Sequence, residues 1–172
     1  MITKRNVIAA IFLTLSLVAV AFLATSTSNY VEFYRAIEKF EMRLQNVDVV
    51  VIEDNVKVNI TFEMSNPTNY VGLSLREWSY LLRFEADNEN LDLSYDTISS
   101  IGEPITVTPH WTQTFEHNSS LYATRPSTSR FLELYNLYQG KEVSWILQVH
   151  AVLITFMGTM GIPMSSPITS EL

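Results

Sequence analysis

Apolar and polar residues alternate most regularly between Val56 and Met64, where every even-numbered residue is apolar and every odd-numbered one is polar or charged. Strand side chains point alternately to the two faces of a sheet, so this pattern predicts a strand with one buried and one solvated face. Asn66-Pro67 follows and ends the strand, because proline fixes φ, lacks an N–H and disfavours a helical conformation at the preceding residue.

Comparable patterns predict further strands over 47–53, 75–85, 91–98, 105–111, 121–125 and 141–157. Pro109 interrupts one of these runs, which makes it an edge strand or a bulged strand. A short amphipathic helix precedes the last run, capped near 127–129 and ended by Gly140. Its apolar residues recur at three- and four-residue spacing: Phe131, Leu134, Tyr135 and Tyr138.

About seven strands and one short helix predict a mainly β protein built as an antiparallel β-sandwich. We place this domain at residues 47–163, which is long enough to bury a core without disulfides. Residues 164–172 are rich in proline and serine and are expected to form a flexible tail.

The segment Val7–Ala24 contains 18 residues without a charge. As a helix it is about 27 Å long, close to the hydrocarbon thickness of a bilayer, and it predicts a transmembrane helix within residues 1–24 that contacts membrane lipid. Lys4-Arg5 precedes it, so the N-terminus is expected to be cytoplasmic and the rest extracytoplasmic in a single-pass cell-membrane protein. The alternative is a cleaved signal peptide, since Ala19-Val20-Ala21 fits a cleavage site.

Residues 25–46 are expected to form a juxtamembrane stalk, in which 30–44 is an amphipathic helix. Its apolar face comprises Phe33, Ile37, Phe40 and Leu44. Tyr30, Phe33 and Tyr34 lie where an aromatic belt would hold the span at the membrane surface. This helix either continues the membrane helix as a plain stalk or, together with the transmembrane helix, binds protein partners.

The formal net charge of −7 argues against a nucleic-acid partner, because few cations are present to neutralise phosphates. All 18 acidic residues and nine of the 11 basic residues follow Arg5, so that part of the chain carries −9. Anionic lipid repels such a domain, which is therefore expected to project from the membrane. Cysteine is absent, which excludes disulfides and cysteine-ligated metals.

The alternating strand that ends in Ser65-Asn66-Pro67-Thr68-Asn69-Tyr70-Val71-Gly72-Leu73, followed by Trp78-Ser79-Tyr80-Leu81-Leu82, resembles the LEA-14-like family. These are the type 2 late-embryogenesis-abundant, or WHy-domain, proteins. Ile105–Pro109 and the closing Gly161-Ile162-Pro163 are similar as well. The resemblance implies a fibronectin-III-like sandwich of seven strands and one helix, no enzymatic activity, and a role in stress that some members perform at a membrane.

Thr68 departs from the family's Asn-Pro-Asn turn, and we expect Asn69 to restore the turn chemistry one position later. For Asn66, Pro67 and Asn69 a structural role in the turn is favoured, with a recognition loop as the alternative. Asn59 and Asn118 begin N-x-Ser/Thr sequons and are candidate glycosylation sites on the outer side of the membrane.

His110, His117 and His150 lack the spacing of metal ligands, and no cysteine can join them. None of the common nucleophile, zinc-protease, phosphate-loop or dinucleotide motifs occurs. We therefore expect neither a metal, a cofactor nor an enzymatic activity.

Three functions agree with the sequence. The first is a membrane-anchored, non-enzymatic sandwich of LEA-14 type that acts by interaction or protects under stress. The second is an accessory subunit of a larger membrane or surface complex. The third is a pilin-like filament protein, which the absence of Gly or Ala between Lys4-Arg5 and the apolar run disfavours.

Overall fold

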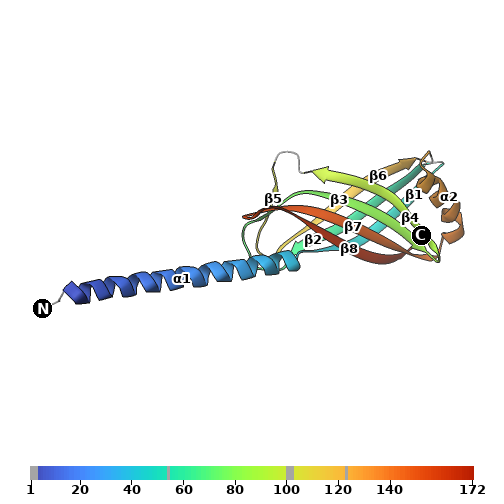
Figure 1. Cartoon of the computed structure of the whole chain (residues 1–172). Helices are drawn as coiled ribbons and strands as arrows, with labels where there is room; N and C mark the ends of the chain where they lie inside the picture. Colours follow the sequence, from blue (N-terminus) through green and yellow to red (C-terminus); the bar gives the residue numbers. More distant parts are fainter. Residues whose placement is uncertain (1–3, 54, 100–102, 123) are drawn as a thin grey trace.

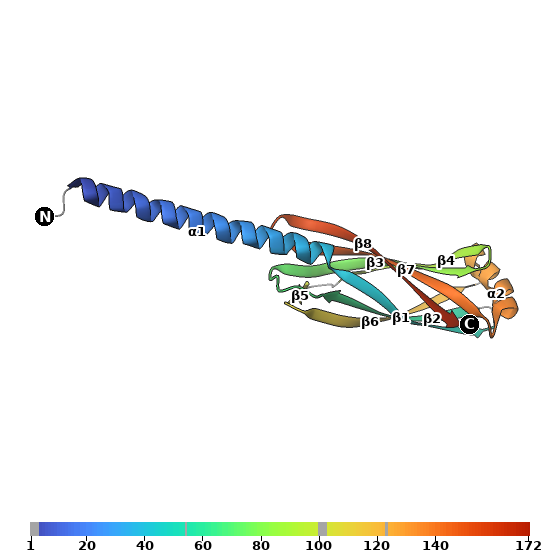
Figure 2. The same cartoon turned by 90° about the horizontal axis from the view of Figure 1, so that it is seen from below.

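The computed structural model consists of a long N-terminal helix followed by a β-sandwich (Figure 1). It describes residues 4–53, 55–99, 103–122 and 124–172; the start of the predicted cytoplasmic tip, residues 1–3, lies outside them. Helix α1 extends from Lys4 to Glu38. In both views of the molecule it leads away from one end of the sandwich, and the C-terminus lies near the opposite end (Figures 1 and 2).

Two antiparallel sheets make up the sandwich, with eight strands among the described residues. The smaller sheet has the order β1-β2-β6, formed by Glu41–Ile52, Asn55–Asn66 and Trp111–Tyr122. The larger has the order β4-β3-β7-β8, formed by Glu89–Ser99, Leu73–Ala86, Glu142–Thr155 and Gly158–Glu171. The short β5, Ile105–Val107, pairs with the start of β3. The predicted sandwich is confirmed, and the sheets do not close into a barrel.

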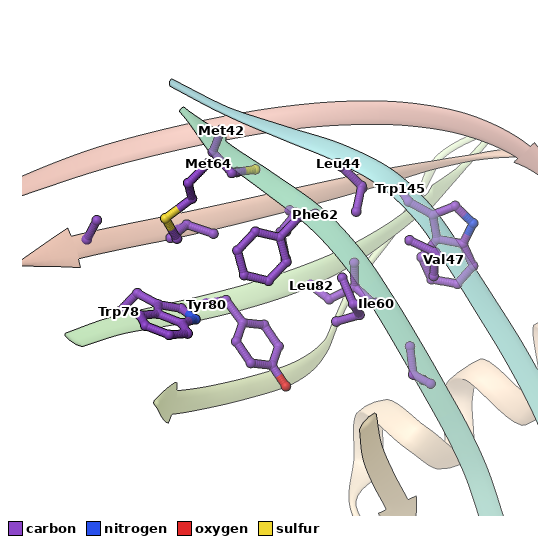
Figure 3. Packing of buried hydrophobic residues seen from close by; sticks show 14 of the residues in the cluster. Met42, Leu44, Val47, Ile60, Phe62, Met64, Trp78, Tyr80, Leu82 and Trp145 are labelled. Carbon is purple, nitrogen blue, oxygen red and sulfur yellow. The ribbon is translucent and has the colours of Figure 1, made fainter. Parts of the chain in front are cut away.

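The core lies between the two sheets (Figure 3). All five apolar residues of the alternating run in β2 are at most 1 % exposed, as predicted. The same alternation holds in β3 and β7, where Tyr80, Leu82 and Trp145 are buried. Figure 3 shows Met42, Leu44 and other β1 and β2 side chains facing those of β3 and β7. Period-two patterning therefore identified the inner faces of these strands correctly.

The predicted amphipathic helix over 30–44 is wrong in its second half. Helix α1 ends at Glu38, and β1 begins at Glu41, six residues before the expected start of the sandwich. The pairing of β1 with β2 passes from Leu44↔Phe62 to Asn46↔Thr61, so Gln45 is an extra, bulged residue. The bulge moves the buried positions of β1 from even to odd numbers, which conceals the strand alternation and resembles helical spacing.

The predicted strand 105–111 is also wrong, because it divides between the two sheets. Strand β5 ends at Val107, a turn follows, and β6 begins at Trp111 in the smaller sheet. His110 has a φ of 54° in this turn, and Pro109 next to it has no N–H for a ladder. Strand β6 continues to Tyr122, so the first two residues of the strand predicted at 121–125 belong to β6. Residue 123 of that prediction lies outside the described residues.

Residues 164–172 are expected from the sequence to be a flexible tail, but all of them except Leu172 belong to strand β8, Gly158–Glu171. This strand pairs with β7 along its whole length, from Gly158 to Glu171. Its half-buried residues alternate with exposed small or proline residues, and the apolar ones among them are Met160, Ile162, Met164 and Ile168. Edge strands tolerate proline, so Pro163 and Pro167 do not end the strand.

Helix α2, Pro126–Tyr138, covers the end of the core that is far from α1. It buries Phe131 and Leu134 and ends before Gly140, whose φ is 73°. The expected serine cap near 127–129 is absent: Arg125 is the N-cap and makes no side-chain capping bond. Proline at the first turn preorganises the helix without such a bond.

Candidate functional site

The membrane-facing candidate is helix α1 itself. It contains the one stretch among the described residues, Asn6–Glu38, that is long and apolar enough to cross a membrane by length and composition. Its most apolar window has no buried residue, and Phe12 and Phe22 are 68 % and 73 % exposed. A helix that is apolar on all sides requires an apolar environment.

The last turns of α1 pack into an aromatic socket at the end of the sandwich. Phe33 and Ala36 are fully buried. The Phe33 ring lies 4.9 Å from Phe156 and 5.6 Å from Tyr70, between centroids, and Tyr30 contacts Phe156 at 5.3 Å. Phe33, predicted to belong to an aromatic belt at the membrane surface, is therefore a buried residue that joins helix and sandwich.

The Asn-Pro turn provides one wall of this socket. Asn66 is fully buried, and its Oδ1 accepts bonds from the Thr68 N–H at 3.2 Å and from the Thr68 hydroxyl at 2.8 Å. The Thr68 Oγ1 in turn accepts from the Tyr70 N–H at 3.3 Å. These bonds fix the chain so that Tyr70 faces α1. Burial raises the pKa of Tyr70 above its ordinary value.

Thr68, not Asn69, makes the side-chain hydrogen bonds within the Asn-Pro turn, so the expectation that Asn69 restores the turn chemistry is wrong. The Asn69 side chain is exposed, and its Oδ1 lies 2.8 Å from the His110 Nε2. The His110 N–H donates to the Thr68 carbonyl oxygen at 3.0 Å. Asn69 therefore ties the Asn-Pro turn to the turn between β5 and β6.

The hairpin between β7 and β8 provides the other wall. Its tip consists of Phe156 and Met157. The Thr155 Oγ1 donates to the Gly158 carbonyl oxygen at 2.9 Å and accepts from the Met157 N–H at 3.1 Å. Gly158 has a φ of 109°, which an L side chain rarely adopts. The tight turn holds Phe156 against Phe33, a contact that the sequence pattern did not indicate.

The two sequon asparagines are paired with each other. Asn59 in β2 stands opposite Asn118 in β6, on the outer face of the smaller sheet. Asn118 is exposed, whereas Asn59 is half-buried and its Nδ2 donates to the Asp48 Oδ2 at 3.3 Å. Their side chains are on the solvated side, and glycosylation there remains a prediction.

A shallow recess of about 440 Å³ lies on the larger sheet. Its outward-facing lining comprises Ser79, Leu81, Tyr95, Gln148, His150 and Pro163. The His150 ring occupies the space in which a Cβ on Gly161 would lie. Tyr95 is 68 % exposed and forms one side of the recess.

The titratable groups do not gather into a metal-binding cluster anywhere in the described part of the chain. His117 lies 3.4 Å from Asp96 and bridges β6 and β4, while His110 and His150 are on different surfaces. The three histidines are thus spread over the sandwich.

The protein is thus a β-sandwich preceded by an N-terminal helix whose apolar surface is exposed. No family model matches the sequence, and no curated protein matches it. Solved structures match the fold. One is the solution structure of AT1g01470 from Arabidopsis thaliana, 13 % identical, with a TM-score of 0.56 over 77 % of this chain and 81 % of that one.

A second is the Arabidopsis "putative late embryogenesis abundant (LEA) protein At2g46140.1". It is 16 % identical, with a TM-score of 0.51 over 91 % of this chain and 84 % of that one. At these identities the likeness is one of fold. The sandwich has an LEA-like fold, as the Asn-Pro motif indicated.

Proposed function

We propose that this protein is a membrane-anchored, extracytoplasmic β-sandwich of the LEA-14-like family that acts without catalysis, as an interaction or stress-protective module. The observation that carries the proposal is the bare apolar surface of α1, joined through Phe33 to a sandwich of LEA-like fold. The span holds the sandwich at the membrane, and Lys4-Arg5 keeps the N-terminus cytoplasmic.

The interaction role is supported by the open recess on the larger sheet. Tyr95 and His150 present an aromatic and an imidazole group to solvent there, which suits recognition of a partner surface better than chemistry. Interaction predicts that Tyr95→Ala and Gln148→Ala leave folding unchanged but reduce recovery of a cross-linked partner from native membranes. Equal recovery with both variants would contradict a role for the recess.

The alternative, an accessory subunit of a membrane complex, is favoured by the exposed apolar residues that continue past the span on α1, such as Val31 and Tyr34. Mild detergent extraction separates the two functions. A monomer on size-exclusion chromatography excludes the subunit, whereas partners that co-migrate in stable proportion exclude a free-standing protective module.

A further inference from the structure

Three large apolar side chains project from the two turns beside α1. Val71 in the Asn-Pro turn is 70 % exposed, and Phe156 and Met157 at the tip of the β7–β8 hairpin are 56 % and 58 % exposed. We call them the apolar rim. Apolar groups gathered at one end of a domain indicate contact with another molecule or a membrane.

The rim lies just beyond the end of the apolar span. Two of its members, Val71 and Phe156, line a recess, and Met157 follows Phe156 at the hairpin tip. The recess is completed by residues of α1 and the Asn-Pro turn: Ser26, Asn29, Tyr30, Tyr70 and Gly72. At the helical rise, Ser26 is about 3 Å and Tyr30 about 9 Å beyond Ala24. The headgroup layer on each side of the hydrocarbon core is roughly 5–8 Å thick. The recess therefore begins within the headgroup layer and reaches its outer boundary, which places the rim beside that boundary.

The charge distribution favours lipid over a charged protein surface as the occupant. Residues 143–170 contain no Asp, Glu, Lys or Arg, and the turn 67–72 contains none either. The chain beyond Arg5 nevertheless carries −9. The turns beside α1 are thus neutral, and the nearby carboxylate on α1, Glu32, is paired with Arg35 at 2.8 Å, which weakens its repulsion of anionic lipid.

We propose that the apolar rim inserts into the headgroup layer of the membrane that α1 spans, so that the sandwich rests on its α1-proximal end. This inference rests on the membrane anchor proposed above. Tyr30, 48 % exposed, completes the contact at the outer boundary of this layer, where aromatic residues are enriched. The remainder of the acidic sandwich projects from the membrane, with α2 farthest from it.

Spin labels provide the test, because the natural chain has no cysteine. The full chain is prepared as single variants Val71→Cys, Met157→Cys, Leu15→Cys and Leu137→Cys, labelled with a nitroxide and reconstituted in phosphatidylcholine vesicles. Leu15 is 61 % exposed on the span, and Leu137 is 57 % exposed on α2 at the far end. Circular dichroism first checks that each variant keeps its fold.

We expect labels at Val71 and Met157 to collide frequently with oxygen and rarely with a water-soluble nickel complex. Their oxygen-to-nickel ratio should be several-fold above that of Leu137→Cys and below that of Leu15→Cys. A ratio at Met157 equal to that at Leu137, with Leu15 in the bilayer, would overturn the inference and leave the anchor intact. Water-exposed Leu15 would overturn the anchor itself. Protection of Met157 from both reagents would indicate a second copy on the rim and overturn lipid contact.

Discussion

At the scale of the residue, Asn66 has the most specific task, because its buried carbonyl organises the turn that forms the socket for α1. Asn66→Ala removes the acceptor for two Thr68 donors and is expected to destabilise the sandwich by about 1–3 kcal/mol. We expect a value near the lower end of this range, because the substitution also removes the Asn66 Nδ2, a buried donor that has no partner in the described residues. Urea unfolding of the purified protein in detergent measures the change.

Asn69→Ala is the matched control, because that side chain is exposed and makes a single bond to His110. It should change the free energy of unfolding by less than about 0.5 kcal/mol. An effect of Asn69→Ala equal to that of Asn66→Ala would contradict the assignment of the turn chemistry to Asn66 and Thr68.

Phe33 connects helix and sandwich, so Phe33→Ala should loosen their junction. Loss of a fully buried phenylalanine side chain costs about 3–5 kcal/mol of stability where the site cannot collapse. Because Phe33 is on α1, we expect this loss to weaken the packing of α1 against the sandwich. Limited proteolysis should cleave the variant between 26 and 40 much faster than the natural chain. The control Phe12→Ala, on the exposed span, should leave the cleavage rate unchanged. A cleavage rate of Phe33→Ala equal to that of the natural chain would disprove the socket.

At the scale of the element, β8 differs most from its expected role. Removing residues 164–172 deletes most of this strand and exposes the edge of β7. It also removes the Ser166 hydroxyl that accepts from the Leu44 N–H at 2.9 Å and connects the two sheets. We expect the truncated protein to unfold at a lower temperature and to aggregate, because an unpaired edge recruits other chains. Unchanged thermal unfolding would mean that these residues are indeed a tail.

A substitution at Ser166 separates the effect of strand pairing from that of the bond between the two sheets. Ser166→Ala removes only the bond to Leu44 and should cost about 0.5–1.5 kcal/mol. The truncation of residues 164–172 should therefore lower the stability far more than Ser166→Ala does. Differential scanning calorimetry of both variants gives the comparison.

A hydrogen bond connects helix α2 to the β3–β4 turn: the Tyr138 hydroxyl donates to the Asp87 Oδ2 at 2.7 Å. The hydrogen bond to Asp87 is the main cause that raises the pKa of Tyr138, and burial adds to it. A folded-state pKa above the ordinary value of about 10 means that the bond stabilises the fold below pH 10 and is lost as pH rises through the folded pKa.

The contribution of Tyr138 to the unfolding temperature should therefore be nearly independent of pH between 7 and about 9, and the unfolding temperature should shift downward above about pH 10. Tyr138→Phe should lower the unfolding temperature at pH 8 and reduce the alkaline shift. Tyr80, whose pKa burial raises, contributes a residual shift in the variant. An alkaline shift of the same size in Tyr138→Phe would show that the bond to Asp87 does not contribute.

Elements with an uninterrupted alternation could be predicted from the sequence, and those in which a local feature disturbs the pattern could not. The buried faces of β2, β3 and β7 follow directly from period two. The bulge at Gln45 hid the first half of β1, whose second half was predicted as the strand 47–53. Prolines hid β8, although Met160, Ile162 and Met164 already alternate in it. The Asn-Pro motif located the turn, but the contact of Tyr70 and Phe156 with Phe33 arises only from tertiary packing.

At the scale of the whole molecule, the protein has two ends with different surfaces. One end carries the apolar span and the neutral turns beside it, and the other carries α2 and the C-terminus (Figure 1). This polarity is what the proposed display on a membrane requires, and with α1 as the anchor the recess on the larger sheet would have a fixed orientation relative to the bilayer.

The central claim is that α1 anchors the sandwich on the outer side of a membrane. Labelling of Leu137→Cys with a membrane-impermeant maleimide in intact cells, followed by carbonate washing of the membranes, tests it most directly. We expect full labelling without lysis and retention of the full-length chain in the washed membranes. Labelling only after lysis, or release of the chain into the carbonate supernatant, would contradict it.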